Sequence, residues 1–137
     1  MKNQTMIVTG GAQGIGRAVV DHFLALGWNV TAVDVRPMEL TDRLEFVQGD
    51  TSLEETARHA VSKTIGRFGQ VDVLVNNAGV GTRGTFKPEE LTLDEWNRVL
   101  GINLTGTFLM AKHTAPYLRK TRGLIVNIAS TRALMSP

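Results

Sequence analysis

One short stretch constrains the fold of this chain most: the glycine-rich segment Thr9-Gly-Gly-Ala-Gln-Gly-Ile-Gly16. An apolar run precedes it at Met6–Val8, and a helical pattern of apolar residues follows it. Strand, glycine turn and helix in this order form the context in which a backbone turn binds phosphate. Glycine allows positive φ angles and close approach of the backbone to a ligand, and the first N–H groups of the helix then face the anion. The spacing G-x-x-x-G-x-G differs from the G-x-G-x-x-G dinucleotide fingerprint, so a tight turn without a ligand stays an alternative at this point.

The composition is that of one soluble globular domain, which we expect to span residues 1–137. The chain is 42% hydrophobic and 20% charged, as is typical of globular proteins. Its 137 residues are long enough to form a sizeable core. Its lysines and arginines are scattered and its net charge is +2, which argues against a nucleic-acid surface. No apolar run approaches the ~18 residues of a membrane span, and the first strand begins too early to leave room for a signal peptide. We therefore expect a cytoplasmic protein. The sequence contains no cysteine, which excludes disulfides and thiol chemistry.

Strand and helix patterns alternate along the chain. Strands are predicted at 5–9, 30–33, 44–47, 71–75 and 124–128, and helices at 15–26, 52–68 and 92–119. Ser52 with Glu55, and Thr92 with Glu95, have the spacing of capping boxes at the starts of the second and third helices. Valine- and isoleucine-rich strands separated by helices predict a parallel sheet covered on both faces. Right-handed crossovers make this a doubly wound α/β fold.

Glycine or polar clusters follow all five predicted strands. They are Gly10–Gly16, Asp34, Asp50, Asn76–Gly79 and Ser130. In doubly wound sheets a ligand binds outside the carboxyl ends of the strands. Five clusters at the correct end strengthen the interpretation of the glycine turn as a ligand site.

Asp34 ends the second predicted strand, and its carboxylate can accept hydrogen bonds from the adenosine ribose hydroxyls of NAD. It would repel the 2′-phosphate of NADP, since like charges ~4 Å apart cost on the order of 4 kcal/mol at an effective dielectric near 20. NAD is therefore the favoured cofactor and NADP the less favoured one, although Arg36 partly offsets the repulsion. The alternative is an exposed turn aspartate.

Three further positions each allow a structural and a functional interpretation. Asp50 either caps the following helix or contacts an adenine edge. Asn76-Asn77-Ala78-Gly79 is either an ordinary asparagine–glycine turn or a surface for a flat ligand, with buried amides that need partners. Asn103 lies on an apolar helix face, where it either ties the helix to a neighbouring strand or orders a water near the site.

The third predicted helix has a second apolar stripe, which suggests contact with a partner subunit. The stripe consists of Leu104, Phe108, Ala111, Ala115 and Leu118. No metal-ligand spacing is visible among the three histidines.

Taken together, these motifs resemble the short-chain dehydrogenase/reductase family over the whole chain, in the family's order and approximate spacing. The resemblance rests on the glycine turn, Asp34, Asp50, Asn76-Asn-Ala-Gly79, Asn97-Arg-Val-Leu-Gly-Ile-Asn103 and Ile125-Val-Asn-Ile-Ala-Ser130. It implies a Rossmann-type sheet with strand order 3-2-1-4-5 and an NAD-dependent oxidoreductase that moves hydride between nicotinamide and an alcohol or carbonyl substrate.

The resemblance also assigns roles to single residues. Asp34 would hold the adenosine ribose, and Asn103 and Ser130 would be two members of the family's catalytic tetrad. The remaining cofactor residues would be Gly10, Gln13, Gly14, Ile15 and Gly16 beside the pyrophosphate and nicotinamide, Asp50 and Thr51 beside the adenine, and Asn77, Ala78 and Gly79 along the ribose channel.

The family's other two catalytic residues form a Tyr-x-x-x-Lys motif, expected about a dozen residues beyond the serine. The 137 residues do not reach that point, and Tyr117 has Lys120 at i+3 rather than i+4. Relative to the family the domain is C-terminally truncated and its sheet incomplete. Because loss of a general acid/base typically lowers a rate 10²–10⁴-fold, we expect these residues alone to be inactive. We expect the N-terminal part of an oxidoreductase; the alternatives are a non-catalytic nucleotide-binding module and a remnant that dimerises through the 93–119 helix. The substrate is not predicted.

Overall fold

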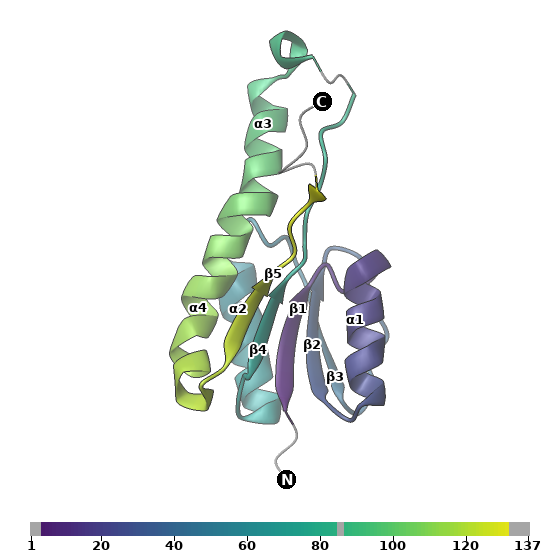
Figure 1. Ribbon diagram of the computed structural model, residues 1–137, viewed down its shortest axis with the longest axis vertical. Coiled ribbons are helices and arrows are strands. Elements are labelled where there is room, and N and C mark those ends of the chain that lie inside the picture. Colours follow the sequence, from purple (N-terminus) through teal and green to yellow (C-terminus); the bar gives the residue numbers. More distant parts are fainter. Residues whose placement is uncertain (1–3, 85–86, 132–137) are drawn as a thin grey trace.

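Five parallel strands form one sheet in the computed structural model, which describes residues 4–84 and 87–131. The strands are β1 (Thr5–Thr9), β2 (Asn29–Asp34), β3 (Leu44–Gln48), β4 (Val73–Asn76) and β5 (Leu124–Asn127). Their order across the sheet is β3-β2-β1-β4-β5 (Figure 1). This confirms the predicted doubly wound α/β fold and its strand order 3-2-1-4-5.

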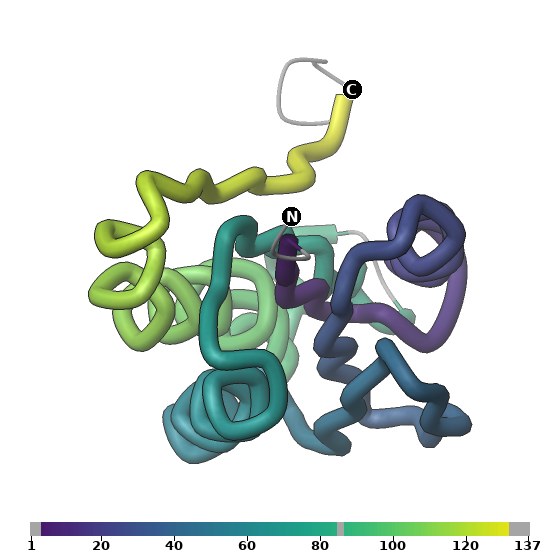
Figure 2. Tube along the Cα trace, turned by 90° about the horizontal axis from the view of Figure 1, so that it is seen from below, coloured from purple at the N-terminus to yellow at the C-terminus, as the bar shows by residue number. Residues whose placement is uncertain are grey.

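Helices cover both faces of the sheet. Helix α1 (Gly14–Ala25) lies on one face, and α2 (Glu54–Phe68) and α4 (Thr107–Thr121) lie together on the other (Figures 1 and 2). A short 3-10 helix η1 (Pro88–Glu90) precedes α3 (Leu93–Leu100), and the π-helix η2 (Gly101–Gly106) joins α3 to α4. None of the helices within the described residues is long and apolar enough to cross a membrane.

Alternation along β1 shows how the sheet builds two cores. Met6 and Val8 join the cluster on the α1 side, where Val20 of α1 is fully buried. Ile7 points to the opposite face and joins the cluster that contains Ala60 of α2 and residues of α4. Burial of an aliphatic side chain of this size stabilises the fold by roughly 1.5–3 kcal/mol. The two apolar faces of the sheet therefore fix the helices that carry the surrounding loops.

The predicted capping box at Ser52 and Glu55 is wrong. Helix α2 begins at Glu54 after Leu53, and no side chain caps it among the described residues. The Ser52 N–H donates instead to the Asp50 carboxylate over 2.8 Å, which closes a turn before the helix. The capping hydrogen bond of the third predicted helix is confirmed, because the Thr92 hydroxyl accepts from the Glu95 N–H at 3.2 Å.

The long helix predicted at 92–119 is confirmed as one helical rod over 93–121, but six of its residues form the π-helix η2 instead of α-helix. A Cβ on Gly106 would lie 3.0 Å from the carbonyl oxygen of Thr51. Glycine thus lets the helical rod formed by α3, η2 and α4 pack directly on the backbone that precedes α2. In Figure 1 α3 extends beyond the carboxyl ends of the strands. Such π-helical segments are frequent at functional sites.

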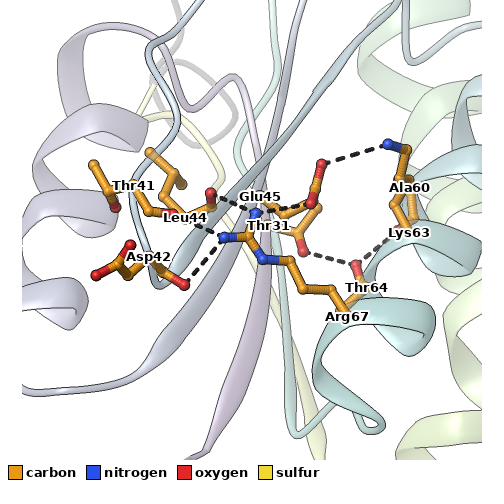
Figure 3. Close-up of polar contacts among 9 residues, drawn as sticks. All are labelled: Thr31, Thr41, Asp42, Leu44, Glu45, Ala60, Lys63, Thr64 and Arg67. Carbon is orange, nitrogen blue, oxygen red and sulfur yellow. Dashed lines mark hydrogen bonds and ion pairs between the residues drawn. The ribbon is translucent and has the colours of Figure 1, made fainter.

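Arg67 of α2 ties the edge strand β3 to the helix that covers it (Figure 3). Its guanidinium donates to the carbonyl oxygens of Thr41, Asp42 and Leu44 at 2.9–3.1 Å and to the Glu45 carboxylate at 2.9 Å. Only 10% of the Glu45 side chain is exposed. The Arg67 fork therefore satisfies a mostly buried carboxylate and three backbone carbonyls at once.

We predict that Arg67→Met lowers the free energy of unfolding by about 1–3 kcal/mol, because it leaves these acceptors without their donor. The matched control is Arg58→Met on the same helix, whose side chain is 65% exposed and whose loss should matter by less than about 0.5 kcal/mol. Urea unfolding of both variants measures the difference. Equal effects of the two substitutions would contradict this role of Arg67.

Candidate functional site

The loops that follow β1, β2, β4 and β5 emerge at one end of the sheet (Figure 1). Four of the five clusters expected at a ligand site lie at the ends of these strands, and the fifth, Asp50, follows β3, which is parallel to the others and ends at the same edge.

Two glycines of the turn have backbone conformations that side chains disfavour. The φ angles of Gly10 and Gly14 are +67° and +54°. The Gly10 N–H donates to the Val33 carbonyl at 2.7 Å, which holds the turn against β2. Gly16 is required for a different reason, since a Cβ there would lie 2.0 Å from the Gly10 carbonyl oxygen. The first turn of α1 consequently lies directly against the turn that precedes it.

The N-terminus of α1 opens outward. No side chain of the described residues caps it, and Ile15 is 64% exposed. A Cβ on Gly14 would meet nothing within 4 Å. A helix start with these properties presents N–H groups and the positive end of the helix dipole to an anion. The backbone here fits a phosphate group.

Asp34 is buried and bonded on both carboxylate oxygens. One oxygen accepts from the Ala12 N–H at 2.9 Å and the other from the Arg36 N–H at 3.0 Å. The side chain of Arg36 in turn donates to the Gln13 side-chain oxygen. Each carboxylate oxygen retains a second lone pair for a hydroxyl donor. Asp34 is therefore no free turn aspartate, because it links the end of β2 to the glycine turn.

Asn77 links the same turn to the end of β4. Its side-chain amide donates to the carbonyl oxygens of Thr9 and Gly10 at 3.0 and 3.2 Å. The Thr9 hydroxyl accepts from the N–H groups of Asn77 and Ala78 at 3.0 and 2.9 Å. Gly10, Gly16 and Asn77 are brought together, since a Cβ on Gly16 would lie 2.5 Å from the Asn77 amide nitrogen.

Asn76 and Ser130 belong to the β4 and β5 side of the site. Asn76 donates through its amide nitrogen to Asn127, its register partner on β5, at 3.0 Å. Its side-chain oxygen is buried without a partner in the described structure. Ser130 is exposed three residues beyond Asn127.

Asp50 and Thr51 lie beside the helical rod. The predicted helix cap at Asp50 is wrong, because its carboxylate accepts from the Ser52 N–H in the turn before α2 and helix α2 has no side-chain cap in the described part of the chain. Thr51 is buried, and its backbone and hydroxyl contact the position of Gly106. Neither contact excludes a ligand at the partly exposed Asp50.

Asn103 of η2 ties the helical rod to the loop after β4. Its side-chain oxygen accepts from the Val80 N–H at 2.8 Å, and its amide nitrogen donates to the Val80 carbonyl at 2.9 Å. This corresponds to the first of the two predicted roles, with a loop residue in place of a strand. Sequence reasoning missed Thr9, Glu95 and Arg98 at this site. In the sequence, Glu95 was recognisable only as part of the capping box with Thr92, and no pattern indicated a role for Arg98.

Glu95 and Arg98 form an ion pair beside the site, at 2.7 Å. Hydrogen bonds from Arg98 and from the Arg83 N–H lower the pKa of Glu95 from its ordinary value of 4.5 to about 2. No group of three or more potential metal ligands occurs within residues 4–84 and 87–131. The arrangement can therefore bind an anionic, hydroxyl-bearing ligand through backbone N–H groups and Asp34.

Known proteins share this architecture. The model of the short chain dehydrogenase family matches residues 4–137. An uncharacterized oxidoreductase of Thermotoga maritima is 36% identical over 99% of this chain and 57% of its own length. L-fucose dehydrogenase of Mus musculus is 37% identical over 93% of this chain and 48% of its own. This chain thus spans about half the length of the curated relatives it matches.

Solved structures agree with the fold. The 3-ketoacyl-(acyl-carrier-protein) reductase from Brucella melitensis, complexed with NADH, superimposes with a TM-score of 0.88 at 30% identity, over 96% of this chain and 59% of that one. An apo SCOR enzyme from Clostridium thermocellum gives a TM-score of 0.89 at 29% identity over 100% and 58%. The family match covers nearly every residue, and the glycine turn, the strand order and the loops after the strands agree with it. The chain belongs to the short-chain dehydrogenase family.

Proposed function

We propose that this chain is the NAD-binding part of an oxidoreductase that transfers hydride between nicotinamide and an alcohol or carbonyl substrate. The observation that carries the proposal is the N-terminus of α1. It has no side-chain cap in the described structure, and a Cβ on Gly14 would meet nothing within 4 Å there. A dinucleotide pyrophosphate matches this N–H cluster in charge and size. We further propose that residues 1–137 act as one NAD-binding domain. The cytoplasmic location of the protein stays a prediction.

The cofactor would lie across the ends of β2, β1 and β4. Gly10, Gln13, Gly14, Ile15 and Gly16 would surround its phosphates, and Asp34 would accept from the adenosine ribose. Asp50 and Thr51 would border the adenine. The nicotinamide half would extend past Asn77, Ala78 and Gly79 toward β5. Bound NAD would supply the hydride acceptor, and the protein would supply orientation and proton transfer.

Asn103 and Ser130 are the catalytic residues that we propose within this chain. Ser130 would donate a hydrogen bond to the substrate oxygen, which polarises the carbonyl or holds the alcohol. Asn103 would fix the loop at Val80 and support a proton-relay water. The Tyr-x-x-x-Lys pair of the family would supply the general acid/base. We propose that the 137 residues alone do not complete the reaction, because they contain no such motif.

Asp34 supports NAD over NADP. Its carboxylate is buried beside the glycine turn, where a 2′-phosphate would meet a like charge. Arg36 lies close by, but its guanidinium already donates to Gln13. We therefore propose NAD as the cofactor, with NADP the weaker ligand.

The predicted apolar stripe of the helical rod is exposed only in part, since Leu118 is 4% exposed within the core and Ala111 packs against that core. Leu104 and Phe108 are 63% and 59% exposed. We propose that a second copy of the chain covers this face, which would give a homodimer or a tetramer.

We predict that the chain binds NADH and that it binds NADPH at least about tenfold more weakly. In Asp34→Asn the ratio of the two affinities should fall by about tenfold, which corresponds to ~1.4 kcal/mol. The physical reason is the loss of the negative charge beside the 2′ position. Calorimetric titration of both nucleotides measures the two affinities. Absence of heat with millimolar NADH would refute the proposed function, and an unchanged preference in Asp34→Asn would refute the role of the carboxylate.

We predict that Phe108→Lys converts the protein to monomers, because a lysine at the centre of the stripe places a charge in an apolar interface. Leu26→Lys is the matched control, since Leu26 is 62% exposed but lies at the end of α1. Sedimentation velocity distinguishes the species. An assembly state that is the same in both variants would show that this surface is not the interface.

A further inference from the structure

Three side chains of the helical rod hold the segment Val80–Arg83, which follows β4. Asn103 bonds both backbone groups of Val80. Arg98 donates through Nη2 to the Gly81 carbonyl at 2.7 Å. Glu95 accepts through Oε1 from the Arg83 N–H at 2.6 Å. The rod thus contacts this loop at three positions within four residues.

Glu95 and Arg98 form a geometrically defined pair. Arg98 donates through Nε to Oε2 of Glu95 at 2.8 Å and through Nη2 to Oε1 at 2.7 Å, a two-point fork. The side chains of Glu95 and Arg98 are only 15% and 21% exposed, whereas those of Arg17 and Asp21, which also form an ion pair, are 49% and 56% exposed. Hydrogen bonds from Arg98 and the Arg83 N–H lower the pKa of Glu95 to about 2, because both contacts favour the charged carboxylate. Each member of the pair also has a backbone partner in the loop, so the pair orders more than its own helix turn.

The loop that this pair holds continues directly from the proposed ligand site. The N–H groups of Asn77 and Ala78 are fixed by the Thr9 hydroxyl. Val80, Gly81 and Arg83 are fixed by the rod. Ala78 and Gly79 therefore lie between one anchor on the sheet and another on the helices, and a Cβ on Gly79 would lie 3.5 Å from the Asn103 side-chain oxygen.

We propose that Glu95 and Arg98 are positioning residues of the dinucleotide site, which hold Val80–Arg83 and thereby keep Ala78 and Gly79 in place for the nicotinamide half of the cofactor. This inference rests on the proposed function, in which the adenosine half lies at Asp34 and the nicotinamide half at the end of β4. It predicts that loss of the pair weakens ligands with a nicotinamide half and spares those without one.

The test compares Glu95→Gln with Asp94→Asn in the full chain. Asp94 is the neighbouring exposed carboxylate in the first turn of the same helix, so the control makes the same charge change beside the same helix dipole. NADH and ADP, which lacks the nicotinamide and its ribose, are titrated into the wild type and both variants. We expect Glu95→Gln to weaken NADH binding about three- to tenfold, the size typical of residues that act through others. ADP binding should change less than about twofold, and Asp94→Asn should affect neither ligand.

Amide hydrogen exchange provides a second readout that does not depend on the cofactor. In Glu95→Gln a neutral amide oxygen replaces the charged acceptor of the Arg83 N–H, and the amide NH2 opposes the Arg98 Nε donor, so exchange of the Arg83 N–H should accelerate about fivefold or more through local opening. The same amide should keep its wild-type rate in Asp94→Asn. Unchanged exchange at Arg83 would overturn the proposed hold on the loop.

The titrations of the two ligands distinguish the outcomes that would overturn this role. Equal losses for NADH and ADP in Glu95→Gln would indicate general destabilisation and overturn the positioning role. Unchanged NADH affinity together with faster exchange at Arg83 would show that the loop does not serve the nicotinamide half, and would overturn it too. If the wild type binds neither ligand, the proposed function fails and the positioning role fails with it.

Discussion

The hydrogen bonds between Thr9 and the end of β4 are the contact on which the site depends. Thr9 is 2% exposed, and its hydroxyl accepts from two consecutive N–H groups. The Asn77 amide returns two bonds to the carbonyl oxygens of Thr9 and Gly10. Register between β1 and β4 brings these strands side by side, but the four bonds join their loops. The glycine turn and the β4 loop therefore behave as one unit.

The other contacts extend this unit in two directions. Toward β2, the Asp34 carboxylate holds the turn through Ala12. Toward the helical rod, Asn103, Arg98 and Glu95 hold the loop beyond Gly79. Gly16 permits the close approach of α1 to this assembly, since any Cβ there would collide with the Gly10 carbonyl. The backbone shape of the site is thus set by polar side chains that are themselves bonded, as a preorganised binding site requires.

Much of the fold was predictable because hydrophobic periodicity and turn chemistry are local signals. The five strands and the glycine turn follow from the spacing of apolar residues and glycines, whereas the order of the strands followed from the resemblance to the short-chain dehydrogenase/reductase family. The π-helical segment was not predictable, because it depends on the packing of Gly106 against Thr51, 55 positions earlier in the sequence. The missing cap at Ser52 has a similar cause, since the Asp50 carboxylate takes the Ser52 N–H into a different turn.

The site was predictable in its location and less so in its internal bonding. Asp34, Asn77 and Asn103 were visible as polar residues after strands or on an apolar helix face. Their partners Ala12, Thr9 and Val80 were not, because backbone acceptors and donors leave no trace in a sequence. Arg98 resembles any surface arginine until the loop that it binds is placed beside it. Residues whose partners lie in the backbone of a distant loop therefore need the structure to be found.

The most direct measurement of the account is the NADH affinity of Thr9→Val compared with Thr9→Ser. Valine keeps the shape of threonine but lacks the hydroxyl, whereas serine keeps the hydroxyl that accepts from Asn77 and Ala78. The account predicts that Thr9→Val lowers the free energy of unfolding by about 1–3 kcal/mol and weakens NADH about tenfold or more, while Thr9→Ser stays close to the wild type in affinity. Wild-type NADH affinity in a folded Thr9→Val variant would contradict the claim that this hydroxyl joins the two loops into one binding unit.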